Sequence, residues 1–478
     1  MRFSTLTTII LSLLFVPKME AQKNIPDSIH SLNIEISIPT RANEKVYFGK
    51  YWKKQTFAQD SLILDRQGKG NMSINESIAP GQYFILIKSD FHIDLLIDKG
   101  QDNIRLYVDE NNPEKNTVTG SKDTELLWDY INDYNTKELQ REALIQQLQM
   151  PDLTPDNRAS KEKQVQEFDR KRKKELTTLI NQHKDTWFAI FLKGREPIEL
   201  PYISPLNKEE YRANVIYKEN HYFDNINLED PRLWNTDFLY GYIDNYFQEW
   251  VDPLPDSLAM AAKNLVEKTK NNEFCFKEML SYLVNQSVSS SVMGSENTWS
   301  KLAEDYIFDK DIPWISKAQL QNLKNKYEVI KHNRIGMKAH NLQLETIDGK
   351  TVNTNEINAE YTLLYFYDPH CGNCVEEIPR LHNNIYAKYK DKGVEIVAIN
   401  IRDNKDDWIK YITNQKLNDW INCADMKYTS QYWLYYDTTG VPTSYILDKD
   451  KIIIGKQLST QNIEKLLDFY LSENNGIN

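Results

Sequence analysis

The residues best suited to do chemistry in this chain are two cysteines three positions apart, Cys371 and Cys374, with Gly372 and Asn373 between them. The chain has only four cysteines in 478 residues, so the cysteines are not the framework of a disulfide-rich fold. Two thiols at this spacing can close into a disulfide and open again. The spacing therefore predicts a site for thiol–disulfide exchange.

The sequence around the two cysteines predicts how they are held. The apolar run LLYFY at 363–367 is typical of a buried central strand. Asp368-Pro369-His370 ends this strand, and a helix is expected from Val375-Glu376-Glu377-Ile378 onward. Cys371 should then lie at a helix N-terminus, where unpaired N–H groups and the helix dipole stabilise a thiolate. Cys374 lies one turn further in and should be more sheltered.

The expected chemistry has two steps. The Cys371 thiolate attacks a substrate disulfide, and Cys374 then attacks Cys371 and releases the reduced substrate. A structural disulfide at the same two residues is the alternative. A zinc site is disfavoured because zinc needs four ligands, and His370, His382 and Cys423 do not form a second paired motif. No metal site is therefore predicted, and Cys423 is expected to be a buried, unreactive cysteine.

A second motif follows downstream, where Gly440-Val441-Pro442-Thr443 precedes an apolar strand at 444–447. Together with CGNCVEEIP at 371–379, this pattern resembles the thioredoxin-like reductases of the TlpA/ResA class, whose motif is Cys-x-x-Cys-x-x-Glu-x-Pro. The resemblance is specific over 336–474. It implies an α/β thioredoxin-like fold in which Pro442 is cis and packs beside the dithiol, and in which Val441 and Pro442 bind the substrate main chain.

The same resemblance assigns roles to two further residues. Glu377 corresponds to a buried glutamate that tunes the acidity of the cysteines in the resembling reductases, and it is placed with Cys371 and Cys374 as catalytic. An exposed helix carboxylate is the alternative for Glu377. His370 stands where thioredoxins usually have tryptophan. It is grouped with the substrate-binding residues, and it either favours the Cys371 thiolate as a partial cation or is simply a turn residue.

Partners follow from this resemblance as well. The substrates are expected to be disulfide-containing client proteins, and the reductant role calls for a membrane dithiol partner that supplies electrons. No cofactor is expected. The residues do not determine the direction of electron transfer, because Gly372 and Asn373 carry no charge that would indicate a strong oxidant.

The remaining sequence predicts a multidomain protein. Period-two alternation at 32–38 and 45–48 indicates strands, and helical periodicity replaces it after 120. The division is expected to be a signal peptide at 1–21, an all-β sandwich-like domain at 22–120, an all-α domain at 121–335 and the thioredoxin-like domain at 336–478. The two middle parts resemble domains of unknown function that are fused to thioredoxin-like proteins of Bacteroidetes.

Charge and the N-terminus limit where the protein works and what it binds. A net charge of -11 argues against nucleic acid as a partner. The basic run at 170–174 is interpreted as the solvated face of a helix, since acidic residues interleave with it. Arg2 and the short apolar run 6–16 predict an export signal. We expect a periplasmic or cell-envelope protein that is not transmembrane after cleavage; an uncleaved signal anchor is the alternative.

Two other functions are compatible with parts of this sequence. A thiol peroxidase would share the fold, but the Pro-x-x-x-Thr-x-x-Cys motif of peroxiredoxins is absent around Cys371, where Asp368 does not supply the threonine. A cell-envelope binding protein is the other alternative. In it, the β and helical domains would recognise a glycan or a protein, and the thioredoxin-like unit would be auxiliary.

Overall fold

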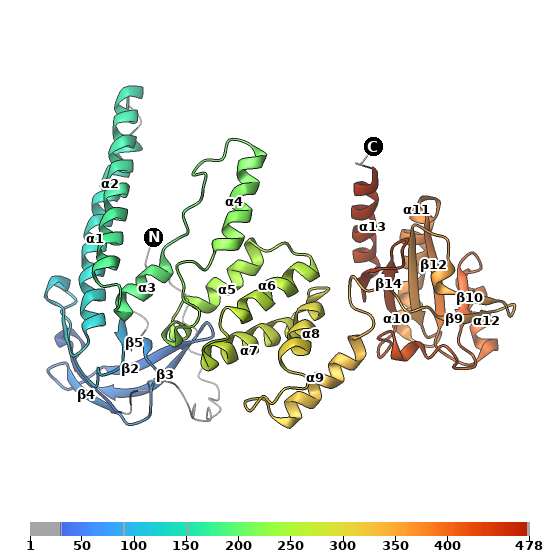
Figure 1. Cartoon of the computed structure of the whole chain (residues 1–478), viewed down its shortest axis with the longest axis horizontal. Coiled ribbons are helices and arrows are strands. Elements are labelled where there is room, and N and C mark those ends of the chain that lie inside the picture. The colour runs from blue at the N-terminus through green and yellow to red at the C-terminus, as the bar shows by residue number, and fades with distance from the viewer. Residues whose placement is uncertain (1–28, 30, 89–90, 151–152, 476–478) are drawn as a thin grey trace. The chain divides into compact units, whose positions relative to one another are not determined.

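The computed structural model describes residues 29, 31–88, 91–150 and 153–475 (Figure 1). These residues fall into two compact units, one within Met1–Val251 and Leu265–Met279 and the other within Asp252–Asn264 and Leu280–Asn478. The predicted signal peptide lies outside the described residues. The predicted division at 120 and 335 remains a prediction.

The first unit opens with two four-stranded sheets, in the orders β4-β1-β7-β8 and β3-β2-β5-β6. The strands are β1 Leu32–Ser37, β2 Lys45–Trp52, β3 Gln55–Ile63, β4 Lys69–Ile74, β5 Gly81–Ile87, β6 Phe91–Ile97, β7 Asn103–Tyr107 and β8 Thr117–Thr119. Alternate residues of β1, such as Ile34 and Ile36, are buried, whereas every residue of β5 is buried. The two sheets confirm the sandwich-like prediction.

Helices dominate the chain from 122 to 330. They are α1 Lys122–Leu148, α2 Pro155–Gln182, α3 Trp187–Arg195, α4 Lys208–His221, α5 Leu239–Glu249, α6 Pro255–Glu267, α7 Glu273–Ser289, α8 Ser295–Tyr306 and α9 Lys317–Ile330. Side chains of Ser121, Thr154, Thr186 and Asn207 cap the first four helices by accepting from backbone N–H groups. Within the described residues, no helix is both long enough and apolar enough to span a bilayer.

The basic run in α2 lies on a helix surface rich in ion pairs. α1 and α2 run side by side (Figure 1), joined by ion pairs of Arg172 with Glu138 at 2.8 Å and of Arg141 with Asp169 at 2.7 Å. Neighbouring basic residues also face carboxylates, as Arg170 does with Glu167. These contacts support the interpretation of a solvated helix face.

The second unit contains a seven-stranded sheet in the order β10-β9-β13-β12-β11-β14-β15. Its strands are β9 Gln343–Thr346, β10 Thr351–Asn353, β11 Tyr361–Tyr367, β12 Val394–Asn400, β13 Ile421–Ala424, β14 Thr443–Leu447 and β15 Ile453–Lys456, and its main helices are α10 Gly372–Leu381, α12 Lys405–Gln415 and α13 Thr460–Asn475. β11 pairs in parallel with β12 and antiparallel with β14. β11, α10 and β12 form a strand–helix–strand crossover, and β9 and β10 form an antiparallel hairpin.

Burial on both sides of β11 fixes where this strand ends. Leu363 and Tyr365 belong to one apolar cluster, which also contains Ile378 of α10, whereas Leu364 and Phe366 belong to the cluster on the other face. Because side chains alternate along a strand, a shift of one residue would exchange the two sets. The register of β11 therefore determines the position of the turn that carries Cys371.

One predicted helix is largely replaced by a loop. The sequence predicts a helix from 429 to 434, but only Tyr432–Leu434 forms a single 3-10 turn. The Asp425 carboxylate accepts hydrogen bonds from the backbone N–H groups of Thr429 and Ser430, and Gln431 has a positive φ of 49°. These features close the segment as a loop before a helix can begin.

Candidate active site

The turn between β11 and α10 places both cysteines. Cys371 is the N-cap of α10, and its carbonyl accepts from the N–H of Val375 at 3.1 Å. The turn is held by Asp368, whose carbonyl accepts from the Cys371 N–H and whose carboxylate accepts from the His370 N–H. Cys371 thus lies at the helix N-terminus, as the sequence predicts.

The two thiols differ in exposure. Cys371 is half-buried and Cys374 is fully buried, and neither is in a disulfide. The Cys371 thiol donates to the carbonyl oxygen of Val441 at a sulfur–oxygen distance of 3.4 Å. Burial raises the pKa of Cys374 to about 12, and the neighbouring Cys371 adds to this rise. One sulfur is therefore accessible and the other is held as a thiol inside the core.

Asp368 is a buried carboxylate with a charged partner. Its Oδ2 accepts from Nε of Arg402 at 2.7 Å, and its side chain is 7% exposed. Burial alone would raise the pKa of Asp368, but the hydrogen bonds from Arg402 and from the His370 N–H outweigh it, so the pKa is lowered. Asp368 is therefore ionised at neutral pH and fixes the turn before Cys371.

Glu377 is only partly buried, with a side chain that is 26% exposed. Its carboxylate accepts from the Thr460 hydroxyl at 2.7 Å and from Nη1 of Arg380 at 2.6 Å. These contacts, with Thr460 contributing most, lower the pKa of Glu377. Glu377 therefore differs both from the buried glutamate that the resemblance implies and from a free surface carboxylate.

His370 and Val441 lie at the same turn, whereas Cys423 lies in the sheet. His370 is 68% exposed, and its Nε2 lies 3.5 Å from a carboxylate oxygen of Asp407. The Val441–Pro442 peptide bond is cis, as the resemblance implies. Cys423 is fully buried in β13, and burial raises its pKa. Among the described residues, no three His, Cys, Asp or Glu side chains gather as a metal site would require.

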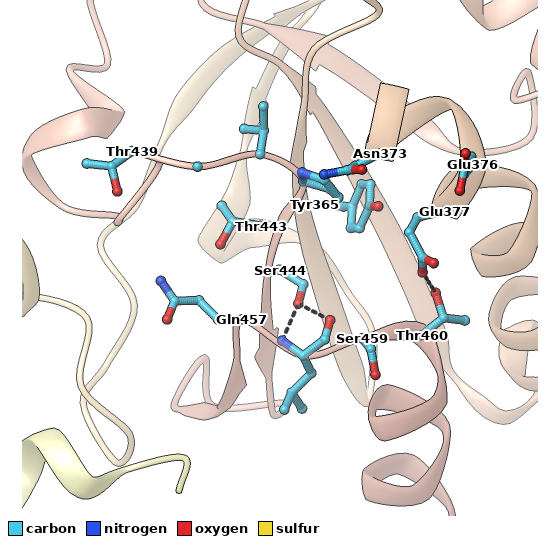
Figure 2. Close-up of a pocket in the computed structure, with 14 residues that line it drawn as sticks. Tyr365, Asn373, Glu376, Glu377, Thr439, Thr443, Ser444, Gln457, Ser459 and Thr460 are labelled. Atoms are coloured by element: carbon cyan, nitrogen blue, oxygen red, sulfur yellow. Dashed lines mark hydrogen bonds between the residues drawn. The ribbon is translucent and has the colours of Figure 1, made fainter. Parts of the chain in front are cut away.

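A pocket of about 600 Å³ opens beside the turn (Figure 2). Its walls come from β11, α10, the Val441–Pro442 segment and the connection between β15 and α13. The lining residues are Tyr365, Asn373, Glu376, Glu377, Thr439, Gly440, Val441, Pro442, Thr443, Ser444, Gln457, Leu458, Ser459 and Thr460. Most of them escape sequence reasoning, because the β15–α13 connection lies about eighty positions from the cysteines and carries no motif.

One polar cluster outside this site was also missed. The sequence leaves His92 without a partner, but its Nε2 lies 2.8 Å from the Tyr51 hydroxyl and 3.2 Å from Oδ1 of Asp94. Asp94 accepts from Tyr51 as well. Tyr51 lies on β2, and His92 and Asp94 lie on β6; these are the two strands that flank β5 in one sheet. Their proximity therefore depends on the sheet order and cannot be recognised in the sequence.

Comparison with known proteins matches residues 335–456 to the AhpC/TSA family. The thiol-disulfide oxidoreductase ResA of Bacillus cereus is 27% identical over 139 residues, which cover 28% of this chain and 75% of that protein. Among solved structures, a domain of a possible thiol-disulfide isomerase from Cytophaga hutchinsonii is 32% identical and matches with a TM-score of 0.28, covering 30% of this chain and 96% of that one. A thioredoxin-like protein from Bacteroides caccae is 24% identical and matches with a TM-score of 0.40, covering 57% of this chain and 99% of that one.

Proposed function

We propose that this chain, whose C-terminal domain is a thioredoxin-like domain of the AhpC/TSA family, is an exported thiol–disulfide oxidoreductase that reduces protein disulfides. One observation carries the proposal: a half-buried Cys371 caps α10, with the fully buried Cys374 one turn further along the same helix. This arrangement provides one accessible nucleophile and one protected thiol that can resolve the intermediate.

In the first step, the Cys371 thiolate attacks one sulfur of a client disulfide. The client S–S bond breaks, a mixed disulfide with Cys371 forms, and the other client sulfur leaves as a thiolate. The unpaired N–H groups at the start of α10 stabilise the attacking thiolate. Solvent exposure of Cys371 lets a protein substrate reach it.

In the second step, Cys374 attacks Cys371, and the second client sulfur leaves as a thiolate. The products are a Cys371–Cys374 disulfide and a client dithiol, so two electrons have passed to the client. Cys374 must first lose its proton, which its raised pKa of about 12 opposes. We propose that the Glu377 carboxylate, which is ionised and lies one turn further along α10, accepts this proton.

The substrate-binding assignments concern the residues beside Cys371. Val441 already offers its carbonyl to the Cys371 sulfur, so a client chain lying along Val441 and Pro442 would bring its disulfide to the nucleophile. His370 is exposed at the same turn and is assigned to the rim that the client contacts.

The cellular setting is part of the same proposal. Export places the dithiol in an oxidising compartment, the periplasm or cell envelope, where structural disulfides form. A reduced Cys371–Cys374 pair must be regenerated after each turnover, and we assign that role to a membrane dithiol partner.

Insulin reduction by the full chain tests the activity. With a small dithiol as electron source, the wild type should accelerate insulin precipitation, and Cys371→Ser should reduce the rate to that of the small dithiol alone. Cys423→Ala, at a buried cysteine of the same domain, is the matched control and should retain activity. Equal rates for the wild type and Cys371→Ser would remove the enzyme proposal and favour a binding protein with an auxiliary thioredoxin-like domain.

Peroxide consumption under the same conditions addresses the thiol peroxidase alternative. Asp368 occupies the position of the peroxidase threonine, three residues before Cys371, and its carboxylate is already engaged by Arg402. It is therefore unsuited to donate a hydroxyl hydrogen bond to peroxide. We expect no peroxide turnover above that of the small dithiol.

A further inference from the structure

The pocket beside the dithiol is lined by negatively charged side chains. Among the residues that the structure describes, Glu376 and Glu377 are the only charged ones that line it, and no Lys, Arg or His of that part contributes to its walls. Asp437 lies just outside, where its carboxylate accepts from the Gln457 amide and the Thr439 hydroxyl of the pocket wall. The wall of the pocket is therefore acidic close to Cys371, whose neighbour Asn373 is also a lining residue.

The two glutamates of the pocket are not equivalent. Arg380 and Thr460 each donate a hydrogen bond to the Glu377 carboxylate, so both of its oxygens already have partners within the chain. Glu376 is exposed, and within the described residues no hydrogen bond or ion pair reaches its carboxylate. Figure 2 shows both side chains on the α10 side of the pocket. Glu376 is thus a carboxylate available to a ligand.

Thr443 adds a buried hydroxyl to the pocket wall. Thr443 is 4% exposed, and its Oγ1 is buried with no hydrogen-bond partner among the described residues. It lies on the pocket wall next to Pro442 (Figure 2). A buried hydroxyl without a partner carries an energetic cost that a hydrogen bond would remove. The hydroxyl can serve as a further hydrogen-bond partner for a ligand.

From these observations we propose, building on the oxidoreductase function above, that the pocket selects clients with a Lys or Arg residue next to the reacting disulfide. The client's cationic side chain pairs with the Glu376 carboxylate while its disulfide faces Cys371. An ammonium group has three donors and no acceptor, so a carboxylate together with neutral hydroxyl and carbonyl oxygens suits it. An acidic side chain at the same place would meet Glu376 and Glu377 and be repelled.

Three disulfide peptides test this selection. They are identical except for one residue beside a cysteine, which is Lys, Gln or Glu. The full chain should reduce the Lys peptide about 3- to 5-fold more efficiently in kcat/KM than the Gln peptide, the range expected of a partly exposed ion pair, and the Glu peptide least. The preference should shrink as salt rises from about 0.05 M to about 0.5 M, because ions screen an exposed pair.

Variants at Glu376 supply the decisive comparison. In Glu376→Gln the Lys-to-Gln ratio should fall to about one, and in Glu376→Lys the Glu peptide should become the best substrate. Asp391→Asn, at an exposed carboxylate of the same domain that does not line the pocket, should keep the wild-type ratio. Equal reduction of all three peptides by the wild type would overturn the selection and leave the oxidoreductase function intact. Reduction of none would overturn the function itself.

Discussion

Cys374 is fully buried, and replacing it separates the two steps of the exchange. Cys374→Ser retains the nucleophile but cannot resolve the mixed disulfide, so turnover should fall by at least about 100-fold. A stable adduct between Cys371 and the substrate should accumulate, visible by mass spectrometry without reductant. If the variant formed no adduct yet lost activity, Cys371 would not be the residue that attacks first.

Asp368 provides a pH-dependent contribution to stability. Its lowered pKa in the folded state means that the carboxylate stabilises the fold above its unfolded pKa of about 3.9, and that this contribution is lost as the pH falls through the folded value. Asp368→Asn should therefore cost about 1–2 kcal/mol at pH 7, with a smaller difference from the wild type in acid. Urea unfolding at neutral and acidic pH measures both differences.

The control for Asp368 is a carboxylate without a buried partner. Asp391→Asn changes the same chemical group at an exposed position and should leave the unfolding midpoint nearly unchanged at either pH. The difference in the free energy of unfolding between the wild type and Asp368→Asn could also stay constant from neutral to acidic pH. That result would show that the Asp368–Arg402 contact does not stabilise the fold through its charge.

The residues of the site were predictable to different degrees. Cys371 and Cys374 are only three positions apart, and the strand and helix signals around them are strong, so their placement at the start of α10 follows from the sequence. The surroundings of Glu377 were not predictable, because Thr460 reaches it from eighty-three positions away. Thr443 next to Pro442 is visible in the sequence, but its unpaired hydroxyl becomes evident only when the strands are assembled.

At the level of elements, a buried lysine joins the helical part of the second unit to its sheet. Lys456, on β15, is 6% exposed and pairs with Glu296 of α8 at 2.9 Å and with Oδ1 of Asn333 at 2.9 Å. Lys456→Met would leave the Glu296 carboxylate, 14% exposed, without its cation. We expect a loss of about 3 kcal/mol in the free energy of unfolding of this unit, measured by urea denaturation.

A double variant distinguishes a lost charge pair from lost packing. Lys456→Met with Glu296→Gln removes both charges, so it should recover part of the stability that Lys456→Met alone loses. If the double variant is as unstable as the sum of the two single variants, the ion pair contributes no coupling, and the docking of α8 depends on apolar contacts instead.

Elements with strong local signals were predictable, and those that depend on tertiary contacts were not. The β9–β10 hairpin is indicated in the sequence by Asp348-Gly349, and Gly393, with a φ of 85°, ends the helical segment after α10. The strand β3 was missed because most of its side chains are half-exposed and show no clean alternation. The expected helix at 429–434 failed because Asp425 captures the backbone N–H groups that a helix would need.

Across the whole molecule, the four cysteines provide a test of the core of both compact units. Cys275 lies in the first unit, and Cys371, Cys374 and Cys423 lie in the second. Cys275, Cys374 and Cys423 are fully buried, and burial raises the pKa of each. Since alkylation requires an accessible thiolate, brief treatment of the reduced native chain with iodoacetamide should label Cys371 alone.

Unfolding supplies the reference for this labelling. In concentrated urea all four cysteines should react at similar rates, because the chain no longer shields any of them. Prior oxidation of the native chain should abolish the single native label, since Cys371 would then be joined to Cys374 in a disulfide. Rapid labelling of Cys423 in the native chain would contradict its burial in β13, and a label on Cys371 that survives oxidation would contradict the redox pair. The two outcomes are independent, so one experiment examines both the fold around the sheet and the chemistry at its edge.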